Sequence, residues 1–445
     1  MSHYFKAKSG ISKDVIIQLS EQKKEPQWMC DFRLNALDIF NSMFMPVWGP
    51  DLSLLNFDLI CYYLKPRAFQ ANSWQELSCE MCQAFECAGL PEAEKSCLSG
   101  VGAQYESEMV YKHIRQDLSD KGVIFVDSDT ALQKYPELFK RYFATLILAQ
   151  DNKFAALNAA FWSGGSFIYV PPHVHVELPL QTYFSINSSQ FGQFERTIII
   201  ADEGSSVRYI EGCSAEMQNG RSLHAGVVEL FAHENAHIRY TTIQNWAPTI
   251  YNLVTKRAIA YRNSRVEWID GNFGSAVTMK YPSVILKESG ARGLLVSLST
   301  AGKCQIQDTG GSMIHEASET SSHIVSKSLS DSGGEAIFRG SIKCKSGLEK
   351  VKSFMQCDSL ILDNESRAQS IPKIDVRSNN VAVSHEATIG AIDREQLFYC
   401  MSRGMTIAEA KALIVGGFAS VFTQELPMEY AVEINRLLSR NIGDL

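Results

Sequence analysis

The fold is decided by residues 196–243, which read RTIIIADEGSSVRYIEGCSAEMQNGRSLHAGVVELFAHENAHIRYTTI. Short runs rich in Ile, Val, Thr, Tyr and Phe follow one another there, and Gly, Asn, Asp and Ser separate them. Such runs at roughly ten-residue spacing predict a succession of short β-strands. The same texture extends from about residue 161 to residue 389, and no convincing amphipathic helix interrupts it.

Two all-β architectures use so many short strands: a sandwich or barrel, or a solenoid whose coils stack along one axis. About 230 residues of uninterrupted strand is long for one sandwich and natural for a β-helix. The strict six- or nine-residue repeat that would decide for a solenoid is not visible in the sequence. Periodicity alone therefore leaves both architectures open.

Helical patterns flank the strand region on both sides. Apolar residues recur at helical spacing in residues 12–22 and 31–45. Beyond the strands, Asp393 is a candidate N-cap, and residues 406–409 (TIAE) form a capping-box sequence. We therefore expect an N-terminal helical region (1–150), a β core (151–390) and a C-terminal helical module (391–445).

Composition limits the classes of function. The chain has 445 residues and a formal net charge of −7, which argues against nucleic acid as a partner. It has neither an apolar run long enough to span a membrane nor the apolar segment of a secretory signal, so we expect a cytoplasmic protein. Its eleven cysteines are odd in number and are better interpreted as thiols than as a disulfide framework.

Cys357 has unusual neighbours in the sequence, because His385 and Glu386 follow it after 28 residues. In a solenoid that offset could bring the two segments to nearby coils and create a mixed thiolate, imidazole and carboxylate ligand set suited to iron or zinc. Adjacent residues of a strand point to opposite faces, so His385 and Glu386 share one site only if the strand ends or bulges there. The alternative is that Cys357 is a small buried apolar residue.

Other candidate motifs are weaker. Residues 233–237 (HENAH) match the H-E-x-x-H zinc motif, but they lie between strand-like runs, where the two imidazoles cannot share an ion. The chain has no P-loop, so it should not hydrolyse ATP by that route. The densest group of thiols is Cys79, Cys82, Cys87 and Cys97. Cys79 and Cys82 would share one face of a helix and could hold a metal or cluster. The spacing matches no standard zinc or ferredoxin pattern, however, so free thiols are the favoured interpretation.

A series of ordered motifs in this chain resembles the SufB/SufD family of iron–sulfur cluster assembly proteins, and its scaffold branch, SufB, in particular. The resemblance runs from about residue 100 to the C-terminus. The motifs are GVGAQYES (100–107), FWSGGSFIYVP (161–171), GQFERT (192–197), IEGCSA (210–215), TIQNW (242–246), YNLVTKRA (251–258), MKYP (279–282), QCDS (356–359), HEA (385–387), EQLFY (395–399) and ELPMEYA (425–431).

The resemblance implies a right-handed parallel β-helix with helical flanks and a role as an assembly scaffold rather than an enzyme. Partners would be a SufD paralogue or a second copy of the chain, a SufC ATPase docked on the C-terminal helices, a sulfur donor of SufE or SufU type, and apo-proteins that receive the cluster. The SufC subunit would supply the ATP hydrolysis. Reduced flavin is a candidate electron source.

The resemblance also implies residue roles. Cys213 would accept persulfide sulfur, which would pass through the β-helix interior towards Cys357. The nascent iron–sulfur cluster would form there, with Glu386 and His385 as candidate ligands. The residues expected to line or support the sulfur route are Gln244, Trp246, Lys256 and Asn187.

One departure from the family pattern affects these roles. Members often carry an arginine two residues before the asparagine of the Phe-x-Ile-Asn segment, and here that position is Ser185, with Asn187 retained. The sequence also leaves alternative functions open. A SufD-like structural partner shares the fold but usually lacks the two functional thiols, and a β-helix enzyme acting on polysaccharide would need acidic clusters that the strands do not display.

Overall fold

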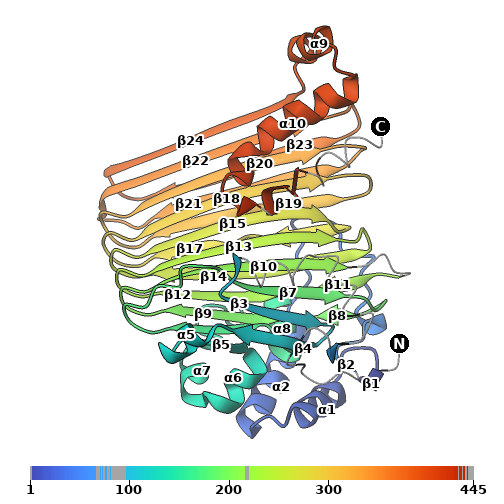
Figure 1. The fold of residues 1–445 in the computed structure, drawn as a ribbon, viewed down its shortest axis with the longest axis vertical. Helices are drawn as coiled ribbons and strands as arrows, with labels where there is room; N and C mark the ends of the chain where they lie inside the picture. Colours follow the sequence, from blue (N-terminus) through green and yellow to red (C-terminus); the bar gives the residue numbers. More distant parts are fainter. Residues whose placement is uncertain are drawn as a thin grey trace.

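The computed structural model of this protein describes residues 3–66, 97–215 and 220–428, together with positions 71, 73, 76, 77, 81, 430–432, 434, 435 and 438. The cysteine group of the N-terminal region, apart from Cys97, lies outside these residues. Within them the chain forms a β-solenoid of about eight turns, flanked by helices at both ends (Figure 1). The structure thus resolves the choice between a sandwich and a solenoid.

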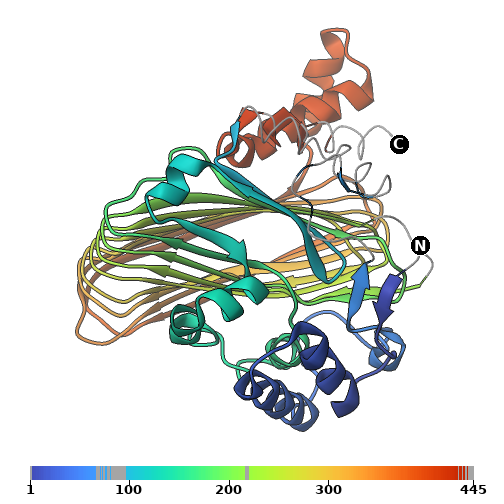
Figure 2. The ribbon, with the colours of Figure 1, turned by 60° about the horizontal axis from the view of Figure 1, so that its bottom comes forward.

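The chain passes back and forth between two sheets, which form the two walls of the solenoid, and some passages contribute two consecutive strands to the same sheet (Figures 1 and 2). In spatial order, sheet 1 contains β24 (Asn380–Ala391), β22 (Glu349–Ile361), β20 (Ser321–Ser330), β18 (Arg292–Ala301), β15 (Arg265–Gly274), β13 (His237–Trp246), β10 (Ser206–Ala215), β7 (Leu180–Ile186), β3 (Gly100–Tyr105) and β4 (Glu108–Ile114). Sheet 2 contains β23 (Arg367–Val376), β21 (Glu335–Cys344), β19 (Ile306–His315), β16 (Val277–Lys280), β14 (Ile250–Ala260), β12 (Val227–Ala232), β9 (Arg196–Ala201), β6 (Ser166–Val170) and β5 (Ile124–Asp127). Three short strands lie beside this path in sheet 2: β8 (Gly192–Gln193), β11 (Ser222–His224) and β17 (Ser283–Leu286).

The coils are held in register by a repeated turn. At each of the turns that lead from sheet 2 back to sheet 1 between β6 and β22, a residue has a left-handed backbone conformation. These residues follow one another at intervals of 27 to 31 positions: His173, Gly204, Asn235, Asn263, Gly290, Glu319 and Lys350. Backbone hydrogen bonds connect successive turns, such as the bond from the Asn235 N–H to the Arg262 carbonyl. Gly and Asn adopt this conformation at low cost, which explains their recurrence between the strands.

The N-terminal helices cover one end of the solenoid (Figure 2). Those in the described residues are α1 (Lys13–Lys23), α2 (Gln27–Ser42), η1 (Phe57–Leu59), α5 (Gln116–Asp120), α6 (Ser128–Lys134), α7 (Pro136–Tyr142) and α8 (Lys153–Phe161). A small sheet of β1 (His3–Lys6) and β2 (Leu64–Pro66) accompanies them. Helix α8 is almost entirely buried and packs against α2. From the sequence, residues 100–127 are expected to belong to the N-terminal helical region. In the structure they also contribute β3, β4 and β5 to the first coil.

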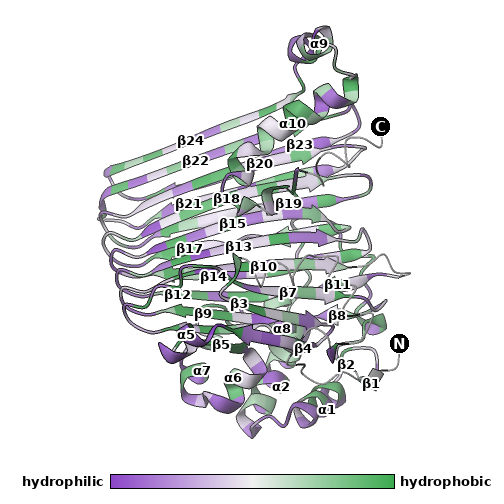
Figure 3. Cartoon of the chain, in the orientation of Figure 1, coloured by the Kyte–Doolittle hydropathy of each residue, from purple (hydrophilic) through white to green (hydrophobic). Residues whose placement is uncertain are grey.

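The C-terminal module consists of α9 (Arg394–Ser402) and α10 (Ile407–Thr423), followed by a segment that is only partly described. Asp393 caps α9, and Thr406 with Glu409 forms both bonds of the capping box of α10, as the sequence predicts. Figure 3 colours much of α10 as apolar, and its buried Val415, Ala419 and Phe422 pack on the outer face of sheet 1. The module is therefore fastened to the solenoid wall rather than folded around a core of its own.

Candidate functional site

Both candidate cysteines lie inside the solenoid, on adjoining rows of side chains. Because side chains alternate along a strand, every second residue of sheet 1 faces the interior, and the parallel register stacks these residues into ladders. The Cys213 ladder runs through Cys213, Gln244, Asn272, Ser299, Ser328 and Ser359. The Glu211 ladder lies two residues earlier on each strand and runs through Glu211, Thr242, Asp270, Ser297, Ser326 and Cys357.

These two ladders form a polar strip in an otherwise apolar interior. All of their members are buried. A third row on the same face is aromatic and then aliphatic: Tyr209, Tyr240, Trp268, Leu295, Ile324 and Met355. Five strand-to-strand steps separate Cys213 from the strand of Cys357, which amounts to about 24 Å at roughly 4.8 Å per step. The polar strip therefore connects the two thiols along the solenoid axis.

Two lysines of sheet 2 reach across the interior to the strip near Cys213. The Nζ atom of Lys256 lies 3.7 Å from Glu211, 3.5 Å from Asp270 and 2.5 Å from the Thr242 hydroxyl, to which it donates. The Nζ atom of Lys280 lies 3.4 Å from Asp270 and donates to the Gln244 side-chain oxygen at 3.2 Å. The charges of this cluster are thus compensated inside the protein by groups of opposite sign.

The environment of the cluster shifts the pKa values of the two lysines in opposite directions. Burial opposes the charge of Lys256, but the nearby carboxylates of Asp270 and Glu211 raise its pKa above the ordinary value. For Lys280 burial dominates, and its pKa falls to about 8 despite the attraction of Asp270. Lys256 is therefore the permanent cation of the site, whereas Lys280 can release its proton near neutral pH.

Cys213 is buried to 2% exposure, and its thiol donates a hydrogen bond to Glu211 at 3.8 Å. Burial, together with the carboxylates of Glu211 and Glu195, raises the pKa of this thiol well above its ordinary value, and the lysines only partly offset the effect. The resting side chain is accordingly a neutral thiol. A reaction at its sulfur requires a base to take the proton, and Glu211 is the group in contact with it.

A histidine network borders the same space. His224 lies 2.8 Å from the Glu195 carboxylate and 2.8 Å from the Asn252 side-chain oxygen. Burial opposes its charge, but the contact with Glu195 raises the pKa of His224 above the ordinary value. Asn252 in turn donates to the Gln244 oxygen at 2.9 Å, which links this network to the Cys213 ladder.

Two buried donors face the interior beside Cys213 without an acceptor. They are the Nε2 atom of Gln244 and the indole N–H of Trp246, neither of which has a hydrogen-bond partner in the described part of the chain. Gln244 is directly opposite Cys213, and Trp246 lies two residues further on the same face, with its ring 4.7 Å from the His224 ring. Unpaired buried donors are unfavourable in a folded protein, so each of them calls for a physical explanation such as a bound water, an ion or a catalytic role.

Asn187 lies apart from these ladders. It follows the end of β7, where the Ser185 hydroxyl donates to its side-chain oxygen at 2.6 Å and its own N–H donates to Glu106 at 3.2 Å. Glu106 is fully buried in a left-handed conformation, and burial raises its pKa to about 7. The structure therefore joins Gln244, Trp246 and Lys256 to the Cys213 site but puts Asn187 in a neighbouring cluster.

At the other end of the strip, Cys357 lies one strand from the open end of the solenoid. It is 2% exposed, and burial raises its pKa to about 11. On the last strand of sheet 1, His385 pairs with Met355 and Glu386 with Gln356. His385 therefore continues the interior row next to Cys357, and its Nε2 atom is buried with no partner in the described residues, while Glu386 points to the opposite face.

The described residues contain no group of three metal-ligating side chains close enough to hold an ion. Cys357 and His385 therefore do not belong to a complete metal site within the described part of the chain. The last coil also presents a free edge: β24 and β23 are the terminal strands of their sheets, and apolar side chains are exposed on them, namely Ile371, Ile374, Val376 and Ile389. A strand edge of this kind is a template for pairing with another chain.

Sequence reasoning missed Glu211, Asp270, Lys280 and the Glu195–His224 pair. A signal was present, because Glu211 shares its strand face with Cys213, and Asp270 lies two residues after a buried tryptophan. To recognise either residue as part of an interior cluster, one must know the register between strands that lie about 30 residues apart in the sequence. No local pattern provides that register.

Comparison with known proteins places this fold and these residues in a family. The family described as "SUF system FeS cluster assembly, SufBD core domain" matches residues 184–418, and "SufBD protein N-terminal region" matches residues 62–182. The chain belongs to the SufBD family. It is 53% identical to iron–sulfur cluster assembly SufBD family proteins of Staphylococcus haemolyticus, Staphylococcus epidermidis and Staphylococcus aureus, over 98% of this chain and 93% of each relative.

Membership of the SufBD family makes this chain a component of iron–sulfur cluster assembly. The core-domain match begins in β7 and ends in α10, so it includes Cys213, Cys357 and the ladders between them. Among the described residues, none of the helices is both long enough and apolar enough to span a bilayer. The family match does not separate the SufB branch from the SufD branch.

Proposed function

We propose that this chain is a SufB-type scaffold that accepts sulfane sulfur at Cys213 and assembles a nascent iron–sulfur cluster at Cys357. The observation that carries the proposal is the continuous polar strip of the two ladders, which joins both thiols inside the solenoid. An interior lined with apolar residues alone would not accommodate a charged sulfur species, because an ion in a dry apolar medium is strongly destabilised.

The first step is transfer of sulfur from a donor persulfide of SufE or SufU type. Glu211 takes the proton of the Cys213 thiol, and the resulting thiolate attacks the outer sulfur of the donor. The donor's sulfur–sulfur bond breaks, its own cysteine leaves as a thiolate, and Cys213 carries the persulfide. The unpaired donors of Gln244 and Trp246, together with the Lys256 ammonium, suit the negative charge of that persulfide.

The second step moves the sulfur along the strip. Between Cys213 and Cys357 the two ladders consist of hydroxyl, amide and carboxylate side chains, so these residues cannot carry sulfur by exchange between thiols. The persulfide therefore gains two electrons and a proton, and hydrosulfide leaves while Cys213 returns to its thiolate. Reduced flavin is the class of two-electron donor that we propose for this step.

The cluster then forms at the open end of the solenoid, where Cys357 and His385 share the interior face. A SufD paralogue, or a second copy of this chain, supplies the missing ligands by pairing with the free edges of β23 and β24. Glu386 points to the opposite face. It becomes a ligand if the edge strand twists on pairing, or if the Glu386 side chain faces the partner chain. Apo-proteins receive the finished cluster, and the protein performs no turnover of its own.

The C-terminal module is the proposed dock for a SufC ATPase. Helix α9 has no buried residue, and its Phe398, Tyr399 and Met401 are exposed to 74%, 58% and 44%. An exposed group of large apolar side chains on a helix is typical of a protein–protein contact. ATP hydrolysis in that partner would drive the assembly cycle.

A donor-loading experiment tests the proposal. The complex is purified anaerobically, given a persulfide donor, and analysed by mass spectrometry for one added sulfur atom at Cys213, and then for iron and acid-labile sulfide. Cys213→Ala should lose both sulfur loading and cluster, whereas Cys357→Ala should keep the loading and lose the cluster. Cys304→Ala, which removes an exposed thiol of a turn, is the matched control and should behave as the wild type.

A SufD-like structural partner is the second candidate function. The burial and raised pKa of Cys213 favour it, because an inert structural cysteine has these same properties. Full cluster assembly by a Cys213→Ala, Cys357→Ala double variant would decide for this candidate and against the scaffold.

A further inference from the structure

An open groove of about 680 Å³ runs over the outer face of sheet 1 beside α10. Its floor is apolar and is formed by Leu294, Val296 and Val325, the last two of which continue under the helix. Phe354 and His323 form one wall with their rings 5.2 Å apart, and Val421 of α10 lines the other side. This face is the opposite side of the wall from the interior ladders, so the groove is independent of the sulfur route.

A row of cations borders the apolar floor. Arg265, Arg292 and Lys352 occupy the same register position on β15, β18 and β22, with Ser321 of β20 between the last two. Arg265 pairs with Glu267 at 2.5 Å. The side chains of Arg292 and Lys352 are exposed and have neither a hydrogen bond nor an ion pair to any residue that the structure describes.

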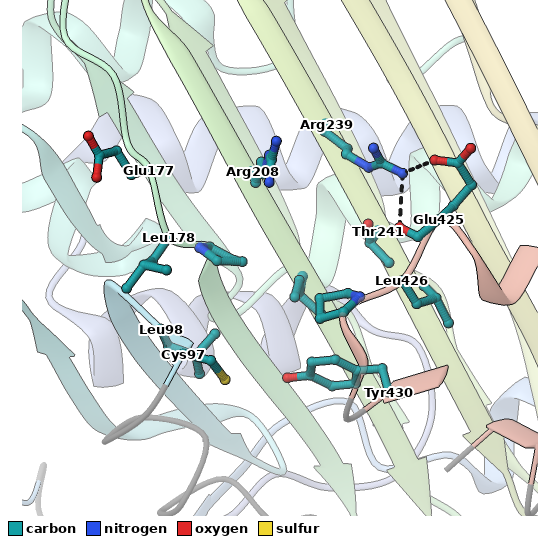
Figure 4. A pocket seen from close by; sticks show the side chains of 13 residues that line it. Cys97, Leu98, Glu177, Leu178, Arg208, Arg239, Thr241, Glu425, Leu426 and Tyr430 are labelled. Carbon is teal, nitrogen blue, oxygen red and sulfur yellow. Dashed lines mark hydrogen bonds and ion pairs between the residues drawn. The ribbon is translucent and has the colours of Figure 1, made fainter. Parts of the chain in front are cut away.

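The neighbouring arginine of the same face is different. Arg239 of β13 forms an ion pair with Glu425, which follows α10, and this contact lines a separate pocket of about 310 Å³ (Figure 4). Glu425 also lines the groove, but its charge is already used by Arg239. A protein with a net charge of −7 thus presents two uncompensated cations beside a groove with an apolar floor.

We propose that this groove docks an acidic amphipathic helix of a partner protein. Charge complementarity selects an acidic segment, and the apolar floor selects one with an apolar face. The spacing selects a helix: Arg292 and Lys352 lie two strand-to-strand steps apart, about 9.6 Å, and carboxylates seven residues apart on one face of a helix lie ~10.5 Å apart along its axis. Alternate residues of an extended peptide repeat at about 6.8 Å and lose this match.

The bound helix would lie along the solenoid axis, beside α10. Its carboxylates would face Arg292 and Lys352, and its apolar side chains would contact Leu294, Phe354 and Val421. The row from Arg265 to Lys352 covers three strand-to-strand steps, about 14 Å, which corresponds to roughly ten helical residues. The groove is therefore long enough for a segment of about three turns.

Fluorescence anisotropy with a designed probe tests this interaction on the full chain. The probe is a labelled peptide of about four helical turns with Glu along one face and Leu along the other. We expect wild-type protein to bind it, with affinity that falls as salt is added, and the Arg292→Glu, Lys352→Glu variant to bind at least tenfold more weakly. The matched control is Lys8→Glu, Lys303→Glu, which changes the net charge equally at exposed lysines outside the groove and should bind as the wild type.

Three results would overturn the proposal. The first is equal binding of the probe by the groove variant and the control, with circular dichroism showing that both are folded. The second is tighter binding of a peptide in which Lys replaces every Glu, or of a single-stranded oligonucleotide that competes with the probe. The third is loss of self-association in the groove variant by sedimentation velocity, which would make a second copy of this chain the occupant.

Discussion

The Nζ atom of Lys256 lies 3.5 Å from an oxygen of Asp270, in the centre of the solenoid, where both side chains are buried. Each therefore supports the charge of the other where solvent has little access. Lys256 also lies above the Tyr240 ring at 4.7 Å, so an aromatic face stabilises the same cation. Because Glu211 shares Lys256 with Asp270, the proposed base for Cys213 depends on this ion pair.

Lys256→Met should destabilise the protein strongly. The substitution preserves most of the side-chain volume but leaves Asp270 and Glu211 with less compensation for their buried charge. Removal of one partner of a buried pair typically costs about 3–5 kcal/mol of the free energy of unfolding, measured by urea denaturation. Lys303→Met, at an exposed turn, should change it by less than about 0.5 kcal/mol. A loss below about 1 kcal/mol for Lys256→Met would show that the pair is not significant for stability.

Glu106→Gln should alter how stability depends on pH. Burial raises the pKa of Glu106 from 4.5 to about 7, so the folded state holds the proton more tightly than the unfolded chain does. In the wild type, the bound proton makes its full contribution to the free energy of unfolding below about pH 4.5. This contribution is lost as the pH rises through about 7, and it amounts to about 3 kcal/mol. The amide introduced by the substitution would remain neutral throughout and escape that loss.

The measurement is urea denaturation at about pH 5 and about pH 8. Glu106→Gln should gain stability relative to the wild type between the two values. The exposed Glu137→Gln variant controls for general charge effects and should follow the wild-type curve. Parallel behaviour of all three proteins would contradict the assignment of a protonated Glu106.

Native alkylation should separate the thiols by burial. Cys304 is exposed, whereas Cys213, Cys357 and Cys344 are buried and have raised pKa values, so both access and thiolate fraction disfavour their reaction. With iodoacetamide near neutral pH, mass spectrometry of the peptides should find Cys304 modified at least ~100-fold faster than Cys213. Comparable rates in the folded protein would mean that the interior opens without a donor. Addition of urea provides the control, since unfolding should remove the difference.

Ile374→Lys should weaken pairing at the free edge of the solenoid. Ile374 is 45% exposed on β23, the last strand of sheet 2, and a lysine there places charge where a partner strand would add. The expected result is a lower assembled mass by sedimentation velocity, whether the partner is a paralogue or a second copy. Leu54→Lys, at a 62% exposed apolar residue of the N-terminal region, should leave the mass unchanged. An unchanged mass for Ile374→Lys would assign assembly to another surface.

The sequence contained the local features of the fold and much less of its interior. Asp393 and Thr406 cap their helices as predicted, because a cap depends only on residues two or three positions away. The offset between Cys357 and His385 also predicts neighbouring coils, and β22 and β24 do pair. The contact of Lys256 with Asp270, by contrast, crosses between the two sheets, and no periodicity within either strand indicates it.

A repeat that would have identified the solenoid was present but irregular. The left-handed turn residues recur at 27 to 31 positions, and several of them are Gly or Asn. Variation of a few residues between coils conceals this period from a search for a strict repeat. The coils tolerate the variation because extra residues enter the turns, while the strands keep their register.

The free edge of the last coil has a consequence for local stability. In a solenoid each coil is stabilised by its two neighbours, so the coil of β23 and β24 has only one. Its amide protons should therefore exchange with solvent faster than those of the central coils, in a gradient that rises towards the C-terminal end. Cys357 lies one strand inside that boundary and His385 on it, so the chemistry proposed for this end occurs in the part of the solenoid that opens at the lowest free-energy cost. A partner that covers the edge would slow the exchange and close the site in one event.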